Sequence, residues 1–305
     1  MLLLDDVLNL FGWHAARVEP PLTPSGAPSP PQVPDTALAD DDDPSWPSAR
    51  IRVAEALWGE GFLFPGGAAE TLRLVNPMGL TAASSLLLVG AGTGGAPRRI
   101  ATDLGVWVTG YETNPRLVAI ANERNLRTGL GRRAQVDLWD PIAPRFPLHY
   151  YHHGMAIEPL RGDKPVPTLA AISLALKPGG QFVLVETVAD VPLDPADPVV
   201  GAWARLDHRP PAAPSELAIT RTMGRLGFDV RIVEDISQRH MRQAIEGWHG
   251  AVRAMEGGHQ SMRQVATVVH EAELWLARFR LMRAGKLRLV RWHTIGRGGI
   301  ELPPG

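Results

Sequence analysis

The sequence contains no cysteine among its 305 residues. This absence excludes disulfide bonds, thiolate metal ligands and a cysteine nucleophile, and it fits a reducing compartment. Long apolar runs are missing as well, because no stretch approaches the roughly 20 residues that span a bilayer. A dominant charge sign is also lacking, since the formal net charge is −1. The chain as a whole therefore offers no field for nucleic acid or for an anionic membrane.

The N-terminal region lacks the features of a secretory signal. It has no basic cluster, and Asp5 and Asp6 interrupt its apolar run. We therefore expect no signal peptide and a cytoplasmic protein. Residues 1–18 instead have the apolar spacing of an amphipathic helix. Such a helix packs on its own chain or on a second copy, so a homodimer through residues 1–18 is left open.

Residues 19–47 are rich in proline and include four consecutive aspartates at positions 40–43. Proline-rich acidic segments build neither helix nor sheet, so we expect an extended linker. The aspartate run is interpreted as a solvated spacer. His249, His259 and His270 are too scattered for a metal site, so the sequence predicts no metal centre.

From residue 81 onward, apolar runs of strand length alternate with helical segments. This alternation is typical of an α/β fold with a doubly wound, mostly parallel sheet of the Rossmann-like kind. We expect a helical cap at 48–80, the cofactor-binding core at 81–190, and a substrate or cap region at 191–305 that completes the sheet. The expected strands are 85–89, 106–111, 133–139, 148–154, 181–186, 227–235 and 287–294, the last at the sheet edge; 191–214 is expected to be a loop.

A glycine-rich turn follows the first expected strand, with glycine at positions 90, 92, 94 and 95. A Cβ atom in such a turn would keep a ligand from the backbone, and the following helix directs free N–H groups into it. Glu112 ends the next apolar run, about 20 residues after Gly90, a spacing that suits a carboxylate on ribose hydroxyls. The sequence therefore predicts a cofactor that carries a nucleoside.

The glycine turn alone leaves the cofactor open. Residues 90–95 fit the dinucleotide pattern G-x-G-x-x-G, and they fit equally the G-x-G-x-G of enzymes that bind S-adenosylmethionine. An NAD(P)-dependent dehydrogenase needs a second half-sheet and a downstream catalytic residue. Residues 190–305 give no sign of either, so the dehydrogenase is kept only as a second alternative.

A second motif narrows the choice. Leu176-Lys-Pro-Gly-Gly, followed by an apolar strand that ends in Glu186, resembles class I S-adenosylmethionine-dependent methyltransferases, and the resemblance runs from about Leu57 to the C-terminus. It implies that the glycine turn holds the methionine and ribose part of the cofactor, that Glu112 binds the ribose, and that an acidic residue after the third strand contacts the adenine amine. The implied cofactor-binding residues are Gly90, Ala91, Gly92, Gly94, Glu112, Thr113, Leu138, Trp139 and Asp140, with Asp137 as an alternative to Asp140.

Within that class the chain resembles the phosphoethanolamine N-methyltransferases. The segments that carry this likeness are 57–67, 163–165, 227–235 and the last helix with Trp275. Three positions depart from the family pattern: Leu88 replaces an acidic residue in the first strand, Trp46 stands near the place of a tyrosine, and Ile157-Glu158-Pro159 stands near the place of a histidine. The resemblance therefore implies the fold and the cofactor, but not the phosphorylated acceptor.

Candidates for proton transfer follow the fourth apolar run. Tyr151, His152 and His153 are expected at its carboxyl end, beside the reacting methyl group, and histidine is a natural base near neutral pH. The alternative is that both histidines are structural hydrogen-bonding groups. Glu158 is a second candidate, either to bind a cationic acceptor or to deprotonate one. The basic residues between 278 and 291 are expected to form a solvated face, and contact with an anionic substrate is the alternative.

The sequence thus predicts an S-adenosylmethionine-dependent methyltransferase that acts on nitrogen or oxygen of a small molecule, with neither nucleic acid nor membrane as a partner. A different class of function is left open. A catalytically impaired methyltransferase fold that serves in binding or assembly also fits the sequence. The features that favour it are Leu88, the absent tyrosine–histidine pair and the proline-rich arm.

Overall fold

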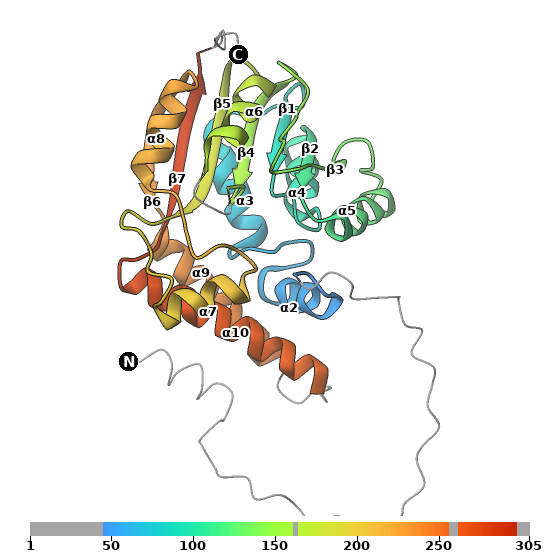
Figure 1. Ribbon diagram of the computed structural model, residues 1–305. Coiled ribbons are helices and arrows are strands. Elements are labelled where there is room, and N and C mark those ends of the chain that lie inside the picture. The colour runs from blue at the N-terminus through green and yellow to red at the C-terminus, as the bar shows by residue number, and fades with distance from the viewer. Residues whose placement is uncertain (1–44, 161–163, 256–261, 298–305) are drawn as a thin grey trace, which may run out of the picture.

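A seven-stranded mixed sheet forms the centre of the protein (Figure 1). The computed structural model describes residues 45–160, 164–255 and 262–297. The predicted helix at 1–18 and nearly all of the predicted linker at 19–47 lie outside the described residues. The strands are β1 (Ser85–Val89), β2 (Trp107–Glu112), β3 (Val136–Leu138), β4 (Tyr151–Ile157), β5 (Leu176–Val188), β6 (Phe228–Asp235) and β7 (Arg288–Gly296).

The strand order is β3-β2-β1-β4-β5-β7-β6. Strands β1 to β5 pair in parallel, and β7 pairs antiparallel with both β5 and β6. The predicted α/β fold class is therefore confirmed. The expectation that the last strand forms the sheet edge is wrong, because β7 lies between β5 and β6. Its buried run from Leu289 to Thr294 fits an interior strand, which is covered on both faces.

Two apolar clusters cover the two faces of the sheet. Successive side chains of a strand point to opposite faces, so Leu86 and Leu88 lie in one cluster while Leu87 and Val89 lie in the other. Leu88 is fully buried, which accounts for an apolar residue at this position of β1. The flanking helices are α4 (Gly95–Leu104), α5 (Pro115–Arg127), α6 (Val166–Ala175) and α8 (Glu216–Arg225), and α3 (Gly67–Val75) with the short η1 (Asn76–Met78) packs beside α4.

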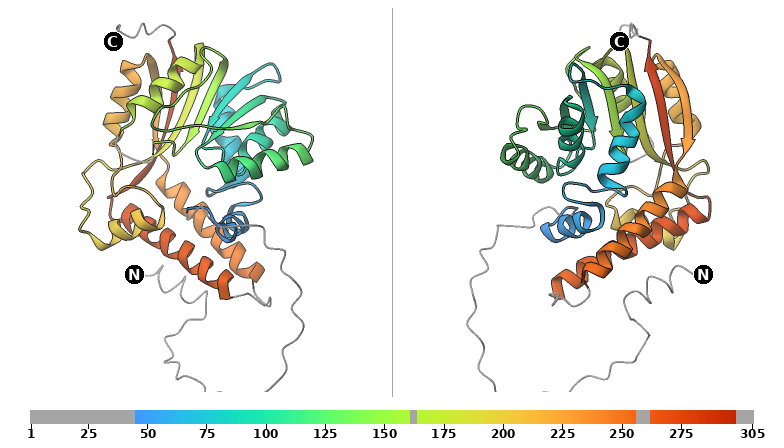
Figure 2. Two further views of the ribbon diagram at one scale, coloured as in Figure 1. Left: turned by 45° about the vertical axis from the view of Figure 1, so that its right-hand side comes forward. Right: turned by 180° about the vertical axis from the view of Figure 1, so that it is seen from behind.

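A second group of helices gathers at the end of the sheet where the parallel strands finish (Figures 1 and 2). It consists of α2 (Ser48–Trp58), α7 (Pro198–Leu206), α9 (Ser237–Met255) and α10 (Met262–Arg283). Helix α10 packs against α7 and α2, and α2 also contacts α9. The carboxyl ends of parallel strands are where such folds bind ligands, so this group covers the candidate site.

The sequence-based expectation of a loop at 191–214 is wrong for its middle part. Helix α7 begins at Pro198, and the side chain of Asp197 accepts a hydrogen bond from the backbone of Val199. An aspartate N-cap followed by proline is a recognised start signal for a helix. The neighbouring prolines at 192 and 195 obscured that signal.

Candidate functional site

The glycine turn joins β1 to α4 at the carboxyl end of the sheet. Gly90, Gly92 and Gly94 have φ values of 85°, 53° and 83°, a region that L-residues avoid. The backbone N–H groups of Gly90 and Ala91 donate to the carbonyl oxygen of Tyr111 at 2.9 and 3.1 Å. A Cβ atom on Gly90 would collide with the carbonyl oxygen of Ile157. Close packing against β4 is thus an additional reason for glycine here, besides ligand access.

The carboxylate of Glu112 lies beside this turn. Its Oε2 accepts a hydrogen bond from the backbone of Gly92 at 2.9 Å. Its Oε1 accepts hydrogen bonds from the backbone of Thr113 at 2.8 Å and of Asn114 at 3.3 Å. Asn114 also caps α5, because its side chain accepts from the first turn of that helix. The structure therefore brings three of the predicted cofactor residues, Gly92, Glu112 and Thr113, into direct contact.

The predicted adenine region follows β3. Leu138 pairs in register with Glu112 and is 56% exposed, whereas Trp139 is buried against Phe146. Leu138 therefore offers an open apolar surface next to the predicted ribose carboxylate. The indole N–H of Trp139 is buried without a hydrogen-bond partner among the described residues.

The two candidate acids of this region have different surroundings. Asp140 is exposed beyond the end of β3 and accepts a hydrogen bond from the backbone of Ile142 at 2.8 Å. Asp137 lies within β3, opposite Tyr111, and its carboxylate accepts from the side chain of Gln135 at 2.7 Å. Asp140 is therefore the one at the carboxyl end of the sheet, level with the glycine turn.

A loop between α2 and α3 closes over the glycine turn. The backbone N–H of Gly95 donates to the carbonyl oxygen of Gly61 at 2.9 Å. A Cβ atom on Gly92 would lie 3.1 Å from the Cδ1 atom of Leu63. The structure shows that residues of this loop form one wall of the candidate cofactor site.

Glu55 of α2 stabilises that loop by hydrogen bonding, a role that the sequence did not predict. Its carboxylate accepts hydrogen bonds from the backbone of Gly61 at 3.0 Å and from the hydroxyl of Thr93 at 2.9 Å, and it forms an ion pair with Arg124 of α5. Burial alone would raise the pKa of Glu55, but Arg124 and Thr93 lower it below its ordinary value. Only the fold reveals this contact, because residues 55 and 124 are distant in sequence.

The expected position of Tyr151, His152 and His153 is wrong. These residues begin β4 rather than end it, so they lie at the amino ends of the parallel strands, opposite the end that carries the glycine turn. The hydroxyl of Tyr151 is bonded to that of Tyr111 at 3.0 Å, and burial raises the pKa of Tyr151. The strand was placed too early because three apolar residues, 155–157, are too short a run to be recognised as part of a strand from the sequence.

Both histidines make structural contacts at the amino ends of the parallel strands. The Nδ1 atom of His152 lies 2.8 Å from the hydroxyl of Ser85, and Nε2 lies 3.0 Å from the ammonium of Lys177. His153 Nδ1 accepts from the backbone of Gln181 at 3.3 Å. Burial lowers the pKa of both rings, and in His152 the charge of Lys177 lowers it further. Their surroundings favour the alternative reading as structural groups.

Glu158 follows the last residue of β4 and lies at the carboxyl end. Its carboxylate accepts two hydrogen bonds from Arg278 of α10, at 2.6 and 3.3 Å, and one from the hydroxyl of Thr187. The Nη1 atom of Arg209 lies 3.9 Å from Oε1 of Glu158. Burial alone would raise the pKa of Glu158, but the charges of Arg278 and Arg209 hold it well below its usual range. A carboxylate held in this way stays ionised and is a poor proton acceptor.

Arg278 is buried, which contradicts the expectation of a solvated basic face at 278–291 for this residue. Burial of an arginine requires a partner charge, and Glu158 supplies it from 120 residues away. A small crevice beside Glu158, with a volume of about 20 Å³, is lined among others by Phe64, Ile157 and His240. Its lining includes Phe64 and Pro65 of the loop over the glycine turn and His240 and Gln243 of α9.

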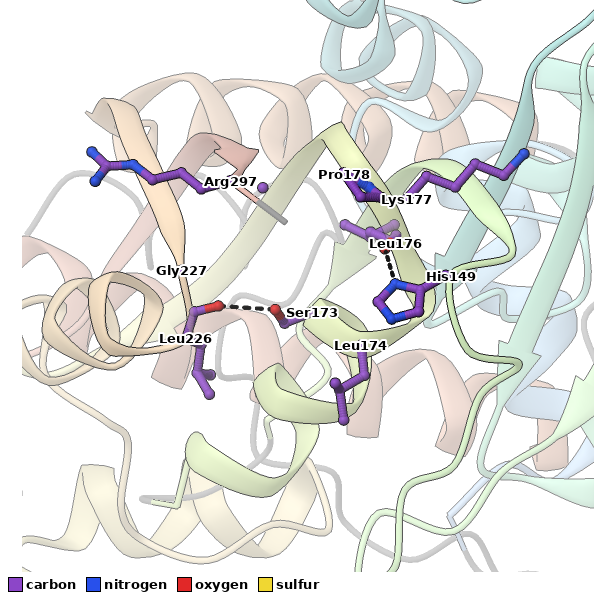
Figure 3. Close-up of a pocket in the computed structure, with 10 residues that line it drawn as sticks. His149, Ser173, Leu174, Leu176, Lys177, Pro178, Leu226, Gly227 and Arg297 are labelled. Atoms are coloured by element: carbon purple, nitrogen blue, oxygen red, sulfur yellow. Dashed lines mark hydrogen bonds between the residues drawn. The ribbon is translucent and has the colours of Figure 1, made fainter. Parts of the chain in front are cut away.

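A larger pocket lies at the end of the sheet where the parallel strands begin, opposite the glycine turn (Figure 3). Its volume is about 260 Å³, and its lining includes His149, Leu176, Lys177, Leu226 and Arg297. The imidazole of His149 lies 3.1 Å from the carbonyl oxygen of Leu176, while Lys177 and Arg297 extend to opposite sides of the pocket. This pocket is far from the glycine turn, because it is formed where β4, β5 and β6 begin.

Two absences apply to the described residues only. Within 45–160, 164–255 and 262–297, no group of three or more histidine, aspartate or glutamate side chains is arranged to hold a metal ion. In the same part of the chain, no helix has the length and apolar character needed to cross a bilayer.

Comparison with known proteins identifies the fold. No protein-family model matches the chain. Phosphoethanolamine N-methyltransferase 2 of Caenorhabditis elegans is 27% identical over 145 residues, which cover 47% of this chain and 33% of that protein. The chain thus spans about a third of the length of this curated relative.

Two solved structures extend the comparison. Phosphoethanolamine N-methyltransferase 2 of Haemonchus contortus, in complex with S-adenosyl-L-methionine, has a TM-score of 0.71 at 18% identity, covering 81% of this chain and 57% of that one. The cyclase SpnF has a TM-score of 0.59 at 20% identity, covering 76% and 82%. The fold is therefore that of the class I S-adenosylmethionine-dependent methyltransferases. Within that class, the sequence is similar to the phosphoethanolamine N-methyltransferases.

Proposed function

We propose that this protein is an S-adenosylmethionine-dependent methyltransferase that acts on nitrogen or oxygen of a small molecule. The observation that carries the proposal is the contact between Glu112 and the backbone of Gly92. This contact links a carboxylate that is suited to bind ribose hydroxyls with a glycine turn whose glycines have positive φ. Both lie at the carboxyl end of a sheet with the strand order β3-β2-β1-β4-β5-β7-β6. The structural neighbours with this sheet include a methyltransferase in complex with S-adenosyl-L-methionine.

The residues around the turn fit an adenosyl cofactor. The turn at Gly90, Gly92 and Gly94, with Ala91 between them, would hold the methionine and ribose portion. Glu112 and Thr113 would hold the ribose, Leu138 would lie under the adenine, and Asp140 would accept from its amine. Trp139 has a buried N–H without a partner among the described residues, which a nearby ligand could satisfy.

S-Adenosylmethionine, when bound, supplies a methyl group already activated by its sulfonium, and transfer then requires in-line attack from a near-attack distance of about 3–3.5 Å. The protein's own part is to orient the acceptor and to exclude water. The loop at 59–67 and helices α2, α9 and α10 cover this end of the sheet and can exclude water there. Glu158 is committed to Arg278, so we propose that it shapes the acceptor site rather than removing a proton.

The two alternatives differ in support. A nicotinamide dehydrogenase is disfavoured, because the sheet ends in an antiparallel β7 between β5 and β6 instead of a second parallel half. A binding or assembly protein on this fold is favoured by the position of His152 and His153, which leaves them outside the proposed methyl site. The cyclase SpnF also has this fold, which is consistent with functions other than methyl transfer.

Calorimetry with the purified full chain tests the proposal. We expect saturable binding of S-adenosylmethionine and S-adenosylhomocysteine and no binding of NAD⁺ or NADP⁺. A panel of small amines, alcohols and phenols with radiolabelled S-adenosylmethionine then tests for transfer. Cofactor binding without transfer to any acceptor would favour the binding or assembly protein, and binding of NAD⁺ alone would overturn the proposal.

A further inference from the structure

We infer that the methyl acceptor of this protein carries no phosphate group, because the buried arginines that would receive a phosphate are already neutralised by carboxylates of the chain itself. This inference rests on the proposed function and specifies the substrate class of the same site. It separates this protein from the relatives named for phosphoethanolamine, to which it is similar over about half of its length.

The buried arginines and their carboxylate partners form a cluster beside the proposed methyl site. Its members are Arg209, Arg278, Glu158 and Asp207. Gly90 of the glycine turn packs against the carbonyl of Ile157, and Glu158 is the next residue. Glu158 also lines the crevice that opens toward Phe64 and His240. An acceptor that reaches the reacting methyl from the side of α9 therefore meets Glu158, and Arg278 and Arg209 lie next to that carboxylate.

Both arginines are buried and both have a carboxylate partner. The side chain of Arg278 is 7% exposed and that of Arg209 is 0% exposed. Arg278 donates to both oxygens of Glu158, and Arg209 lies 3.2 Å from Asp207 and 3.9 Å from Glu158. The two guanidinium charges are thus balanced by the two carboxylates within the cluster.

Within residues 45–160, 164–255 and 262–297, the other titratable groups around the cluster add no positive charge. Burial lowers the pKa of His240 to about 3, so its ring is neutral near pH 7. Burial and the neighbouring Glu158 raise the pKa of Glu186 to about 7, so this group contributes either nothing or a negative charge. Moving a phosphate dianion from water into such a site would require desolvation, and no free cation among the described residues compensates for it.

The arginines still have hydrogen-bond capacity. Nε and Nη2 of Arg209 and Nε of Arg278 are buried without a partner among the described residues. A neutral oxygen, such as a hydroxyl, ether or carbonyl, would satisfy these donors and bring no charge into the site. The geometry therefore fits a small amine or alcohol that carries neutral oxygen atoms.

The experiment uses the full chain, with and without S-adenosylhomocysteine, in calorimetric titrations with inorganic phosphate and with phosphoethanolamine. We expect the wild-type protein to give no saturable binding below about 1 mM. Glu158→Gln removes the carboxylate that neutralises Arg278 and should increase the affinity for both probes by about tenfold or more. Glu216→Gln, which removes a partner of the partly exposed Arg288, is the matched control and should bind like the wild type.

Asp207→Asn is a second variant, which frees Arg209 if Glu158→Gln does not fold. Submillimolar binding of either probe to the wild type, or preferred methylation of phosphoethanolamine over ethanolamine, would overturn the inference. A folded variant whose affinity for phosphate does not rise would overturn it too. The phosphate titrations need no cofactor, so their outcome is separate from the calorimetric test of S-adenosylmethionine binding.

Discussion

The Oε2 atom of Glu112 lies 2.9 Å from the backbone nitrogen of Gly92. This contact links the end of β2 to the turn after β1, and the same carboxylate also receives the backbone N–H of Thr113. The hydrogen bonds fix the direction of the carboxylate before any ligand arrives. Such preorganisation reduces the entropy lost on binding, so Glu112 should contribute strongly to cofactor affinity.

Glu112→Ala is expected to weaken binding of S-adenosylhomocysteine by about 1–3 kcal/mol, the range for a hydrogen bond to a charged group. Isothermal titration calorimetry measures this change directly. Glu123→Ala, on the exposed side of α5, is the control and should leave the affinity unchanged. Equal affinities for wild type and Glu112→Ala would remove Glu112 from the site.

Gly90→Ala is expected to destabilise the fold more than Gly129→Ala. Both glycines have positive φ, 85° and 72°, but a Cβ atom on Gly90 meets the carbonyl of Ile157, whereas one on Gly129 meets nothing within 4 Å. Gly129→Ala should lower the free energy of unfolding by about 1 kcal/mol, from backbone strain alone, and Gly90→Ala should lower it by more. Chemical denaturation compares the two. Similar losses would mean that the turn moves away from β4 at little cost.

Glu55→Gln is expected to loosen the loop at 59–67, because the variant loses the ion pair with Arg124. The KM for S-adenosylmethionine should rise about three- to tenfold, since a wall of the site becomes less ordered. Steady-state kinetics with varied cofactor concentration provides the measurement. Arg127→Met, which removes an exposed arginine three residues after Arg124 on α5, should leave KM at the wild-type value.

Glu186 is expected to make stability fall as pH rises toward neutrality. Burial and the Glu158 carboxylate raise its pKa to about 7, so the folded state binds more protons than the unfolded chain between about pH 4.5 and pH 7. Its stabilising contribution is complete below that interval and is lost as pH rises through 7. Glu186→Gln should reduce the fall in unfolding free energy between pH 5 and pH 8 by about 1–3 kcal/mol.

Denaturant titrations at several pH values test this expectation. Glu123→Gln, an exposed carboxylate, should keep the wild-type pH dependence. An unchanged pH dependence in Glu186→Gln would show that Glu186 titrates as an ordinary carboxyl group.

Local patterns in the sequence were sufficient for much of the fold. The run 85–89, the turn at Gly90 and the carboxylate at Glu112 are close in sequence, so spacing alone predicts that they meet. The limits of β4 could not be predicted in this way. Polar residues such as His152 and His153 stand inside that strand, where contacts with Ser85 and Gln181 accommodate them.

The contacts around Glu158 illustrate what the sequence does not contain. Glu158, Thr187, Arg209 and Arg278 meet because four separate elements finish or cross at the same end of the sheet. No local spacing relates residues so far apart. The buried charge of Arg278 also has no signature in its own helix, where neighbouring arginines remain exposed, as Arg280 and Arg283 do.

The insertion of β7 between β5 and β6 has a consequence during synthesis on the ribosome. Strand β6 emerges about 50 residues before β7 but has no partner until β7 arrives, and at usual elongation speeds that interval lasts several seconds. During this time the unpaired side of β5 is an edge that can recruit strands of other nascent chains. A stop codon ahead of Arg288 would make that exposure permanent, so the truncated product is expected to aggregate.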